Sequence, residues 1–252
     1  RQFITSVAIF SVYRGLDRGV RVLSNINIGL ALILLTFVVI AGPTVKILLS
    51  YGDNLVNYFQ DIVRLSNWNR PDDEAWYHDW TIFYWAWWIS WSPFVGMFIA
   101  RISKGRTIRE FLSVVMLIPL MFNLIWFTSF GETAIDQHQR GLGNLSEPVG
   151  EISLILFYML DNLLFPIFTS LFALFMLVLF FVTSSDSGSL VIDTITSGGK
   201  SDPPRIQRVI WAVIQGLLAI VLLVGGGSYA LSAIQSGAIS MAAPFIFILI
   251  AA

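Results

Sequence analysis

The chain has 252 residues, of which 56% are hydrophobic and only 12% are charged, against roughly 25% charged residues in an ordinary soluble domain. A soluble domain of this length could not bury so much apolar surface, so the composition excludes a water-soluble globule. The 15 basic and 16 acidic residues leave no positive charge for nucleic acid, and the lack of cysteine excludes disulfides and thiolate metal sites. The sequence therefore predicts a polytopic membrane protein.

A membrane-crossing helix needs about 20 mainly apolar residues, and runs of this kind recur along the chain. The predicted spans are Phe3–Tyr13, which is cut short, Ile26–Leu49, Trp80–Ala100, Phe111–Phe130, Asn162–Ser185, Val209–Val224 and Tyr229–Ala252. The runs are apolar on every side, whereas strands of a membrane barrel would alternate. We predict an all-α fold of about six full spans and one truncated span. Both ends fall inside apolar segments, so we expect an internal fragment of a larger transporter or channel.

The segment Asn54–Ser66 has a different pattern. Apolar residues recur there with the period of a helix and leave a polar face of Asn57, Gln60, Asp61 and Arg64. This pattern predicts an amphipathic helix that lies at the outer membrane interface or against a neighbouring subunit.

Loop charges indicate an orientation. If Arg14–Val22 is cytoplasmic, alternation of the spans puts Arg101–Glu110 and Ser185–Arg208 on the same side. These three segments carry ten of the fifteen basic residues and a net charge of +5, whereas the rest of the chain carries −6. The positive-inside rule favours this orientation and makes the basic run from Arg101 a topology anchor.

The stretch from Trp80 to Gly96 is rich in tryptophan. On a helix Trp87, Trp88 and Trp91 fall within about 100° of one another and so share one side. Tryptophan gathers at membrane interfaces, but Trp91 lies about 16 Å beyond Trp80 along a helix, near mid-membrane. Two interpretations stay open, namely bulky rings packed in a helix bundle and an aromatic ligand box.

Pro93 lies inside the same stretch. It cannot donate a hydrogen bond to the carbonyl of Ile89, and its ring clashes there. We expect the helix to weaken or break at this point, as the discontinuous helices of secondary transporters do, although a plain proline kink explains the same pattern. The spans hold almost no charge at depth, so a bound cation would have to be held by aromatic faces. A quaternary ammonium suits such a site because it has no N–H to satisfy.

Several segments carry a resemblance to a known family: Trp85–Phe111, Leu23–Asn27, Gly42–Thr44 and Phe181–Ser187. Over essentially its whole length the chain resembles the betaine/carnitine/choline transporter (BCCT) family. This resemblance implies a protein of about twelve spans whose core is a pair of inverted five-helix repeats, of which this chain would hold the second. It also implies transport of trimethylammonium-type solutes.

The resemblance assigns a substrate site. Trp87, Trp88 and Trp91 match positions that line the family's aromatic box. Phe94 matches a position below that box, near a proposed second ion site. The chemistry inferred from the tryptophan cluster agrees with this assignment, because aromatic faces attract a methylated cation.

A sodium site is implied at Phe180, Thr183 and Ser184. Two hydroxyls and a backbone carbonyl at this spacing offer hard oxygen ligands on one helix face, which suit sodium by analogy with other oxygen-ligated ions. The alternative is that both hydroxyls only bond to the preceding helical turn. Asp186 fits either a helix cap or a partner in a cytoplasmic gate.

The predicted function is an ion-coupled symporter of quaternary ammonium compatible solutes, such as glycine betaine, choline or carnitine, that works by alternating access in the cell membrane. No cofactor is expected apart from sodium as coupling ion, and the resemblance to the family's outer helix implies a homotrimer. A substrate exchanger, a carrier of sulfonium solutes and an ion channel are the alternatives. An enzyme is excluded because the two histidines and the absence of cysteine leave no positioned general base.

Overall fold

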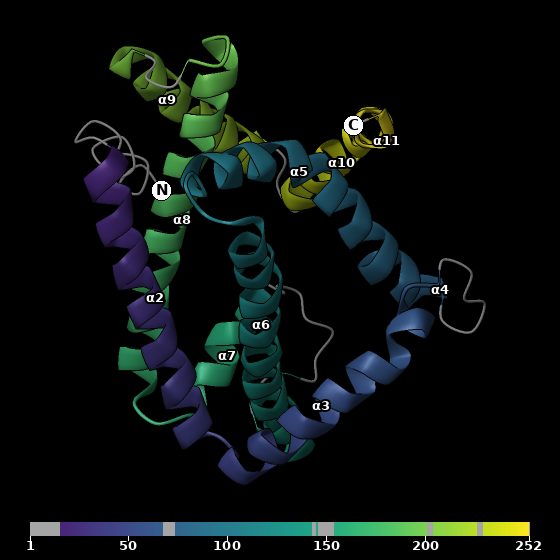
Figure 1. Cartoon of the computed structure of the whole chain (residues 1–252). Coiled ribbons are helices and arrows are strands. Elements are labelled where there is room, and N and C mark those ends of the chain that lie inside the picture. Colours follow the sequence, from purple (N-terminus) through teal and green to yellow (C-terminus); the bar gives the residue numbers. More distant parts are fainter. Residues whose placement is uncertain are drawn as a thin grey trace. The chain divides into compact units, whose positions relative to one another are not determined.

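The computed structural model describes residues 16–67, 74–142, 145, 154–200, 204–225 and 229–251. Within those residues every regular element is a helix (Figure 1), which confirms the predicted all-α class. The elements are α2 (Leu16–Ala41), α3 (Thr44–Leu65), α4 (Glu74–Trp76), the π-helix η2 (Tyr77–Ile82), α5 (Phe83–Ile102), α6 (Ile108–Gln139), α7 (Ile155–Asp161), α8 (Pro166–Thr196), α9 (Arg205–Gly225), α10 (Ala230–Ser240) and α11 (Ala242–Ala251).

The chain divides into two compact units. Unit 1 comprises Arg1–Arg21, Ile62–Gly105 and Val182–Ala252, and unit 2 comprises Val22–Asp61 and Arg106–Phe181. Unit 1 holds the tryptophan-rich α5 and the helices α9, α10 and α11. Unit 2 holds α6, α7 and most of α2 and α3.

The core of unit 2 joins α2, α7 and α8. Its buried side chains are Ala31, Leu34, Val38, Met159, Leu160, Ala173 and Met176. From α6 the half-buried rings of Trp126 and Phe130 pack against this cluster and stack with their centroids 4.5 Å apart. Figure 1 shows α7 beside α6, and residues of the two helices are in contact. Apolar side chains from four helices therefore share one core.

The predicted span 26–49 is divided between two helices. α2 ends and α3 begins at the Gly42-Pro43 turn. Thr44 Oγ1 donates a hydrogen bond to the carbonyl oxygen of Val39 at 2.7 Å and so ties the start of α3 to the end of α2. Hydropathy misses this turn because apolar residues continue on both sides of it.

The predicted amphipathic segment 54–66 forms the second half of α3. Polar contacts within unit 2 hold α3 to α6. Asn54 Nδ2 donates to Thr128 Oγ1 at 3.1 Å, and the Lys46 ammonium lies 3.4 Å from the carboxylate of Glu132. The location of the segment 54–66 at a membrane interface stays a prediction.

α6 extends beyond the predicted span 111–130 at both ends. Thr107 and Glu110 form a capping box at its start: the Glu110 amide donates to Thr107 Oγ1 at 3.2 Å, and the Thr107 amide donates to Glu110 Oε2 at 3.0 Å. At the other end Gly141 adopts a φ of +68°, and the next amide donates to the carbonyl of Gln137 at 2.9 Å. This is a Schellman ending. Residues 131–139, which follow the predicted span, are therefore helical.

α8 continues about three turns past the predicted span 162–185. It ends where Gly198 and Gly199 take φ angles of +70° and +83° and the Gly199 amide donates to the carbonyl of Thr194 at 2.8 Å. The segment Ser185–Arg208, predicted as a cytoplasmic loop, is thus a loop only between α8 and α9.

In unit 1, α10 and α11 both pack against α5 (Figure 1). A turn at Met241 separates these two helices, so the predicted span 229–252 is interrupted. α9 contains the predicted span 209–224 and begins one turn earlier. At the start of α5, Thr81 Oγ1 of η2 donates to the carbonyl of Leu65 at 3.1 Å. α5 is therefore held along its length and at its N-terminal end.

In the described part of the chain, four helical segments are long and apolar enough to cross a membrane. They are Val22–Ala41, Ile108–Gln139, Pro166–Thr196 and Ser232–Ala251, and Ile206–Leu222 is a shorter apolar helix. These segments support a polytopic membrane protein. The predicted short span 3–13 lies outside the described residues.

Candidate functional site

Three of the four predicted substrate-site rings form a row along α5. The rings of Trp88 and Trp91 have their centroids 6.3 Å apart, and those of Trp91 and Phe94 are parallel within 2° at 5.9 Å. The spacing of three residues places each ring about one turn above the previous one. Trp88 is 59% and Trp91 47% exposed, so both indoles offer free ring surface. We refer to these three residues as the aromatic row.

Trp87 lies outside the aromatic row. Its ring packs on Phe83, one turn earlier, with a centroid distance of 5.6 Å. The helical angle placed Trp87 on the same side as Trp88, but each ring pairs with the neighbour three or four residues away. The structure therefore brings Trp88, Trp91 and Phe94 together and gives Trp87 a different partner.

α5 is continuous through Pro93 and not broken there. Ser92 Oγ donates to the carbonyl of Ile89 at 2.8 Å, which is the hydrogen bond that the proline nitrogen cannot make. Ser90 Oγ likewise donates to the carbonyl of Trp87 at 2.8 Å. The expected break is wrong because a serine hydroxyl satisfies the carbonyl that the proline leaves without a donor.

The three predicted sodium-site residues share α8. Phe180, Thr183 and Ser184 span one turn, so one face carries a carbonyl and two hydroxyls. Thr183 is buried, whereas Ser184 is exposed. The carbonyl of Thr183 accepts a hydrogen bond from Ser187 Oγ at 2.9 Å. Their arrangement on one turn is compatible with neutral oxygen ligands for a small cation.

The second half of α8 carries buried polar residues that sequence reasoning assigned to a loop. Asp186, Ser189 and Asp193 are all fully buried, and their spacing of three and four residues places them on one helix face. Asp186 lies far from both ends of α8, so it is not a helix cap. Its role in a gate stays a prediction. The spacing was a sequence signal for a helix, because residues three and four positions apart share one helical face, whereas the burial of that face comes from the structure.

A buried ion pair connects this face to α9. Arg208 Nε lies 3.2 Å from Asp193 Oδ2, and the side chains of the two residues are 10% and 0% exposed. The sequence places Arg208 in a predicted cytoplasmic loop. Arg208 is instead a buried partner of a carboxylate on the preceding helix, because α9 begins at Arg205 and turns its first buried face toward α8.

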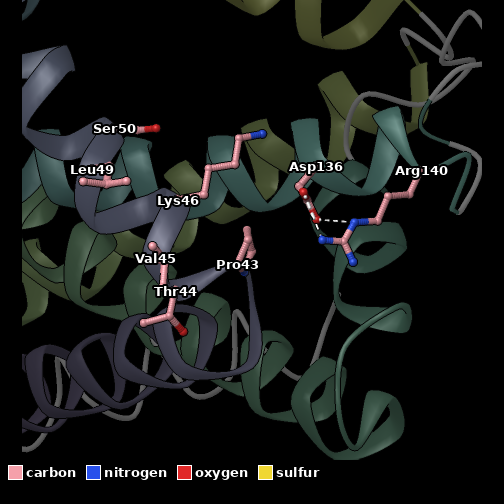
Figure 2. Close-up of a pocket in the computed structure, with 8 residues that line it drawn as sticks. All are labelled: Pro43, Thr44, Val45, Lys46, Leu49, Ser50, Asp136 and Arg140. Atoms are coloured by element: carbon pink, nitrogen blue, oxygen red, sulfur yellow. Dashed lines mark hydrogen bonds and ion pairs between the residues drawn. The ribbon is translucent and has the colours of Figure 1, made fainter.

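A pocket of about 610 Å³ lies in unit 2 (Figure 2). Its lining residues come from the start of α3 and the end of α6: Pro43, Thr44, Val45, Lys46, Leu49, Ser50, Asp136 and Arg140. Figure 2 shows Arg140 turned toward Asp136, and Arg140 Nε lies 2.9 Å from the carboxylate. Lys46 pairs with Glu132, so the cations are neutralised by carboxylates. None of the predicted site residues lines this pocket, and we assign it no part in solute binding.

The all-α fold with its long apolar helices defines a polytopic membrane protein. Its sequence matches the family model of the betaine/carnitine/choline family transporters (BCCT) over residues 2–252. The chain belongs to this family. It is therefore a multi-pass membrane protein of a transporter family and not an enzyme.

Curated relatives give the same result. A "Glycine betaine transporter 1" of Vibrio parahaemolyticus serotype O3:K6 (strain RIMD 2210633) is 50% identical over 98% of this chain and 47% of its own length. A glycine betaine/proline/choline/ectoine transporter of the same organism is 49% identical over 98% of this chain and 44% of its own length. A glycine betaine transporter of Bacillus subtilis (strain 168) is 42% identical, with 98% and 48% covered. The chain spans about half the length of the curated relatives it matches.

Proposed function

We propose that the transporter to which this chain belongs is an ion-coupled symporter of quaternary ammonium compatible solutes, with glycine betaine, choline or carnitine as cargo. The names of the relatives support the solute class, since they include glycine betaine and choline. Alternating access is part of the proposal. The aromatic row supplies the solute-binding surface contributed by this chain.

The proposal rests mainly on the row of rings that Trp88, Trp91 and Phe94 form along α5. A trimethylammonium group offers methyl-covered positive charge, which aromatic faces attract without hydrogen bonds. Each such contact contributes roughly 0.5–2 kcal/mol. The two exposed indoles and the stacked phenylalanine therefore offer several cation–π contacts to a trimethylammonium group along α5.

The test is uptake of radiolabelled glycine betaine and choline by the whole transporter in cells without other carriers. Trp88→Ala and Trp91→Ala each remove one ring and are expected to raise KM about 3-fold to 30-fold, the range equivalent to one cation–π contact. Trp85→Ala is the matched control, because Trp85 is also an exposed indole on α5, at 55%, but lies outside the aromatic row. We expect its KM to stay within about twofold of the unmodified protein.

A second substitution separates ring electrostatics from ring volume. Trp91→Phe keeps an aromatic face and is expected to retain more affinity than Trp91→Leu, because the leucine has no quadrupole. Equal KM values for these two variants, or an unchanged KM in Trp88→Ala and Trp91→Ala, would remove the aromatic row from solute binding.

The solute range is also part of the proposal. The name of one relative includes proline and ectoine. A sulfonium solute presents the same methyl-covered charge as a quaternary ammonium. The solute classes can be ranked by how strongly each unlabelled solute inhibits uptake of radiolabelled glycine betaine. The solutes are betaine, choline, carnitine, a dimethylsulfonium analogue, proline and ectoine. A preference for methylated cations over proline supports binding on the aromatic row, whereas a preference for proline contradicts it.

The coupling ion and the assembly complete the proposal. We infer sodium at Phe180, Thr183 and Ser184, because one turn of α8 groups hydroxyl and carbonyl oxygens of the kind that hard cations take. A homotrimer is proposed through the exposed apolar side chains of α3, among them Val56, Phe59 and Val63. Light scattering of the purified protein checks the trimer, and a monomeric mass would contradict it.

A further inference from the structure

The Asp193–Arg208 pair lies in a hairpin of α8 and α9 that several polar side-chain contacts connect. Besides the 3.2 Å contact between the two charges, Gln207 Nε2 donates to Thr196 Oγ1 at 2.7 Å and Trp211 Nε1 donates to the same oxygen at 3.1 Å. One threonine of α8 thus binds two residues of α9 that lie one turn apart. These polar contacts define how the two helices are aligned along their length.

The alignment continues toward the middle of α8. A Cβ atom at Gly188 would lie 3.4 Å from Gln215 Oε1, so the side chain of Gln215 lies directly over this glycine. Thr196 contacts Gln207, and Gly188 contacts Gln215. Gly188 precedes Thr196 on α8, whereas Gln215 follows Gln207 on α9, so both contacts fit one antiparallel register of the two helices. Gly188 is only one turn beyond Ser184. The register of the hairpin therefore sets which part of α9 lies beside the turn of α8 that carries the proposed cation ligands.

A buried ion pair is suited to setting a register. Desolvation of both charges offsets most of their attraction, so such a pair contributes little net stability. A shift of α8 against α9 by one turn would separate the two charges, and breaking a buried ion pair is strongly unfavourable. A buried apolar residue of α9 such as Ala212 would tolerate such a shift far better, because apolar burial is non-directional. The charges thus penalise wrong alignments more than they stabilise the correct one.

We propose that Asp193 and Arg208 are positioning residues for the cation site, because they fix the register of α8 against α9 and thereby the part of α9 that supports the turn carrying Thr183 and Ser184. This inference rests on the proposed ion-coupled transport. Neither residue touches the cation: Asp193 is ten residues beyond Thr183, about 15 Å along the helix.

The test uses the whole transporter with Asp193→Asn, Arg208→Gln and the exchange Asp193→Arg/Arg208→Asp. Each single change removes one charge and is expected to raise the sodium concentration for half-maximal uptake about tenfold, within the usual range for coupling between separate sites. The exchange restores opposite charges and is expected to recover part of that shift. Asp136→Asn/Arg140→Gln is the matched control, because it removes an ion pair of similar length that is more exposed and lies on a single helix.

A spectroscopic measurement separates register from loss of folded protein. Spin labels at Ile195 of α8 and Leu217 of α9, both exposed, report the alignment of the two helices through the distance between the labels. We expect this distance to shift or broaden in Asp193→Asn and to return toward its original value in the exchange variant. If the single variants lower only the amount of folded protein, with the sodium dependence and the label distance unchanged, the inference is wrong.

Uptake by the unmodified protein separates this inference from the proposed function. If that uptake does not depend on sodium, proton or another coupling cation, the proposed symport fails and the positioning role fails with it. If it depends on a cation and the variants leave that dependence unchanged, only the positioning role fails.

Discussion

Gly42 lies in the turn between α2 and α3 and faces Thr133 of α6. A Cβ atom there would be 2.7 Å from Thr133 Oγ1 and 2.7 Å from the carbonyl oxygen of Val38. Thr133 is buried, so its side chain has little room to move away. We expect Gly42→Ala to lower the free energy of unfolding by about 1–3 kcal/mol, the usual cost of overpacking.

Gly29 provides the matched control. It lies in α2, the helix that precedes the Gly42 turn, and a Cβ atom there would meet nothing within 4 Å. Gly29→Ala is expected to leave the unfolding temperature unchanged or to raise it slightly, because alanine has the higher helix propensity. Thermal unfolding of both variants in detergent compares them. Equal stability of the two would mean that the turn adapts to the added methyl group.

Single residues also show where prediction from the sequence ends. Trp87, Trp88 and Trp91 share one side of an ideal helix, and this much follows from helical spacing alone. The pairing of Trp87 with Phe83, and of Trp88 with Trp91, depends on which neighbour each side chain turns toward. Side-chain rotamers decide that choice, and helical spacing does not contain them.

α5 shows how an element accommodates a proline. Pro93 leaves the carbonyl of Ile89 without an amide donor, and Ser92 Oγ takes that place at 2.8 Å. Ser92→Ala removes this donor in a partly buried helix. We therefore expect the free energy of unfolding to fall by about 1 kcal/mol, the usual net value of a hydrogen bond.

A double substitution identifies the cause. In Ser92→Ala/Pro93→Ala the alanine amide at position 93 can donate to Ile89, so the loss from Ser92→Ala should be recovered. Ser90→Ala is the control, because the carbonyl of Trp87 that Ser90 contacts also lies within reach of a helical amide four residues later. Unfolding by heat or denaturant measures the three variants. A loss that persists in the double variant would show that Ser92 acts through some other contact.

Helix ends depend on local backbone hydrogen bonds more than on hydropathy. Apolar runs located the membrane helices, but α6 and α8 continue beyond their predicted spans. Both helices end at glycines with positive φ, namely Gly141 and Gly198. The Thr107–Glu110 capping box and these glycines can be recognised in the sequence, so the helix ends were predictable from residues that a hydropathy window ignores.

At the scale of the whole molecule, the fold changes which charged residues belong to an exposed cytoplasmic loop. Asp193 and Arg208 were assigned to a cytoplasmic loop, but they are buried against each other between α8 and α9. Without Arg208, nine of the remaining fourteen basic residues still lie in the three segments assigned to the cytoplasmic side. The positive-inside argument therefore keeps its direction, because the rule counts lysine and arginine and not net charge.

Energy coupling is a property of the whole transporter. Glycine betaine carries no net charge, so its movement with one sodium ion transfers one positive charge. A membrane potential of 100 mV then supplies about 2.3 kcal/mol, equivalent to roughly 50-fold accumulation. We expect proteoliposomes with an inward sodium gradient and an inside-negative potential to accumulate glycine betaine above the external concentration. Collapse of both gradients by ionophores should abolish this accumulation.

Substitutions on α8 connect this accumulation to the proposed cation ligands. Thr183→Ala removes one proposed ligand and is expected to lower the accumulation ratio and raise the sodium requirement about tenfold. Thr194→Ala is the control, because its hydroxyl donates to the carbonyl of Leu190 at 2.8 Å within the same helix. Accumulation that requires a second solute inside the vesicle would identify an exchanger. Movement that stops at equal concentrations, whatever the gradients, would identify a channel-like path and contradict coupling.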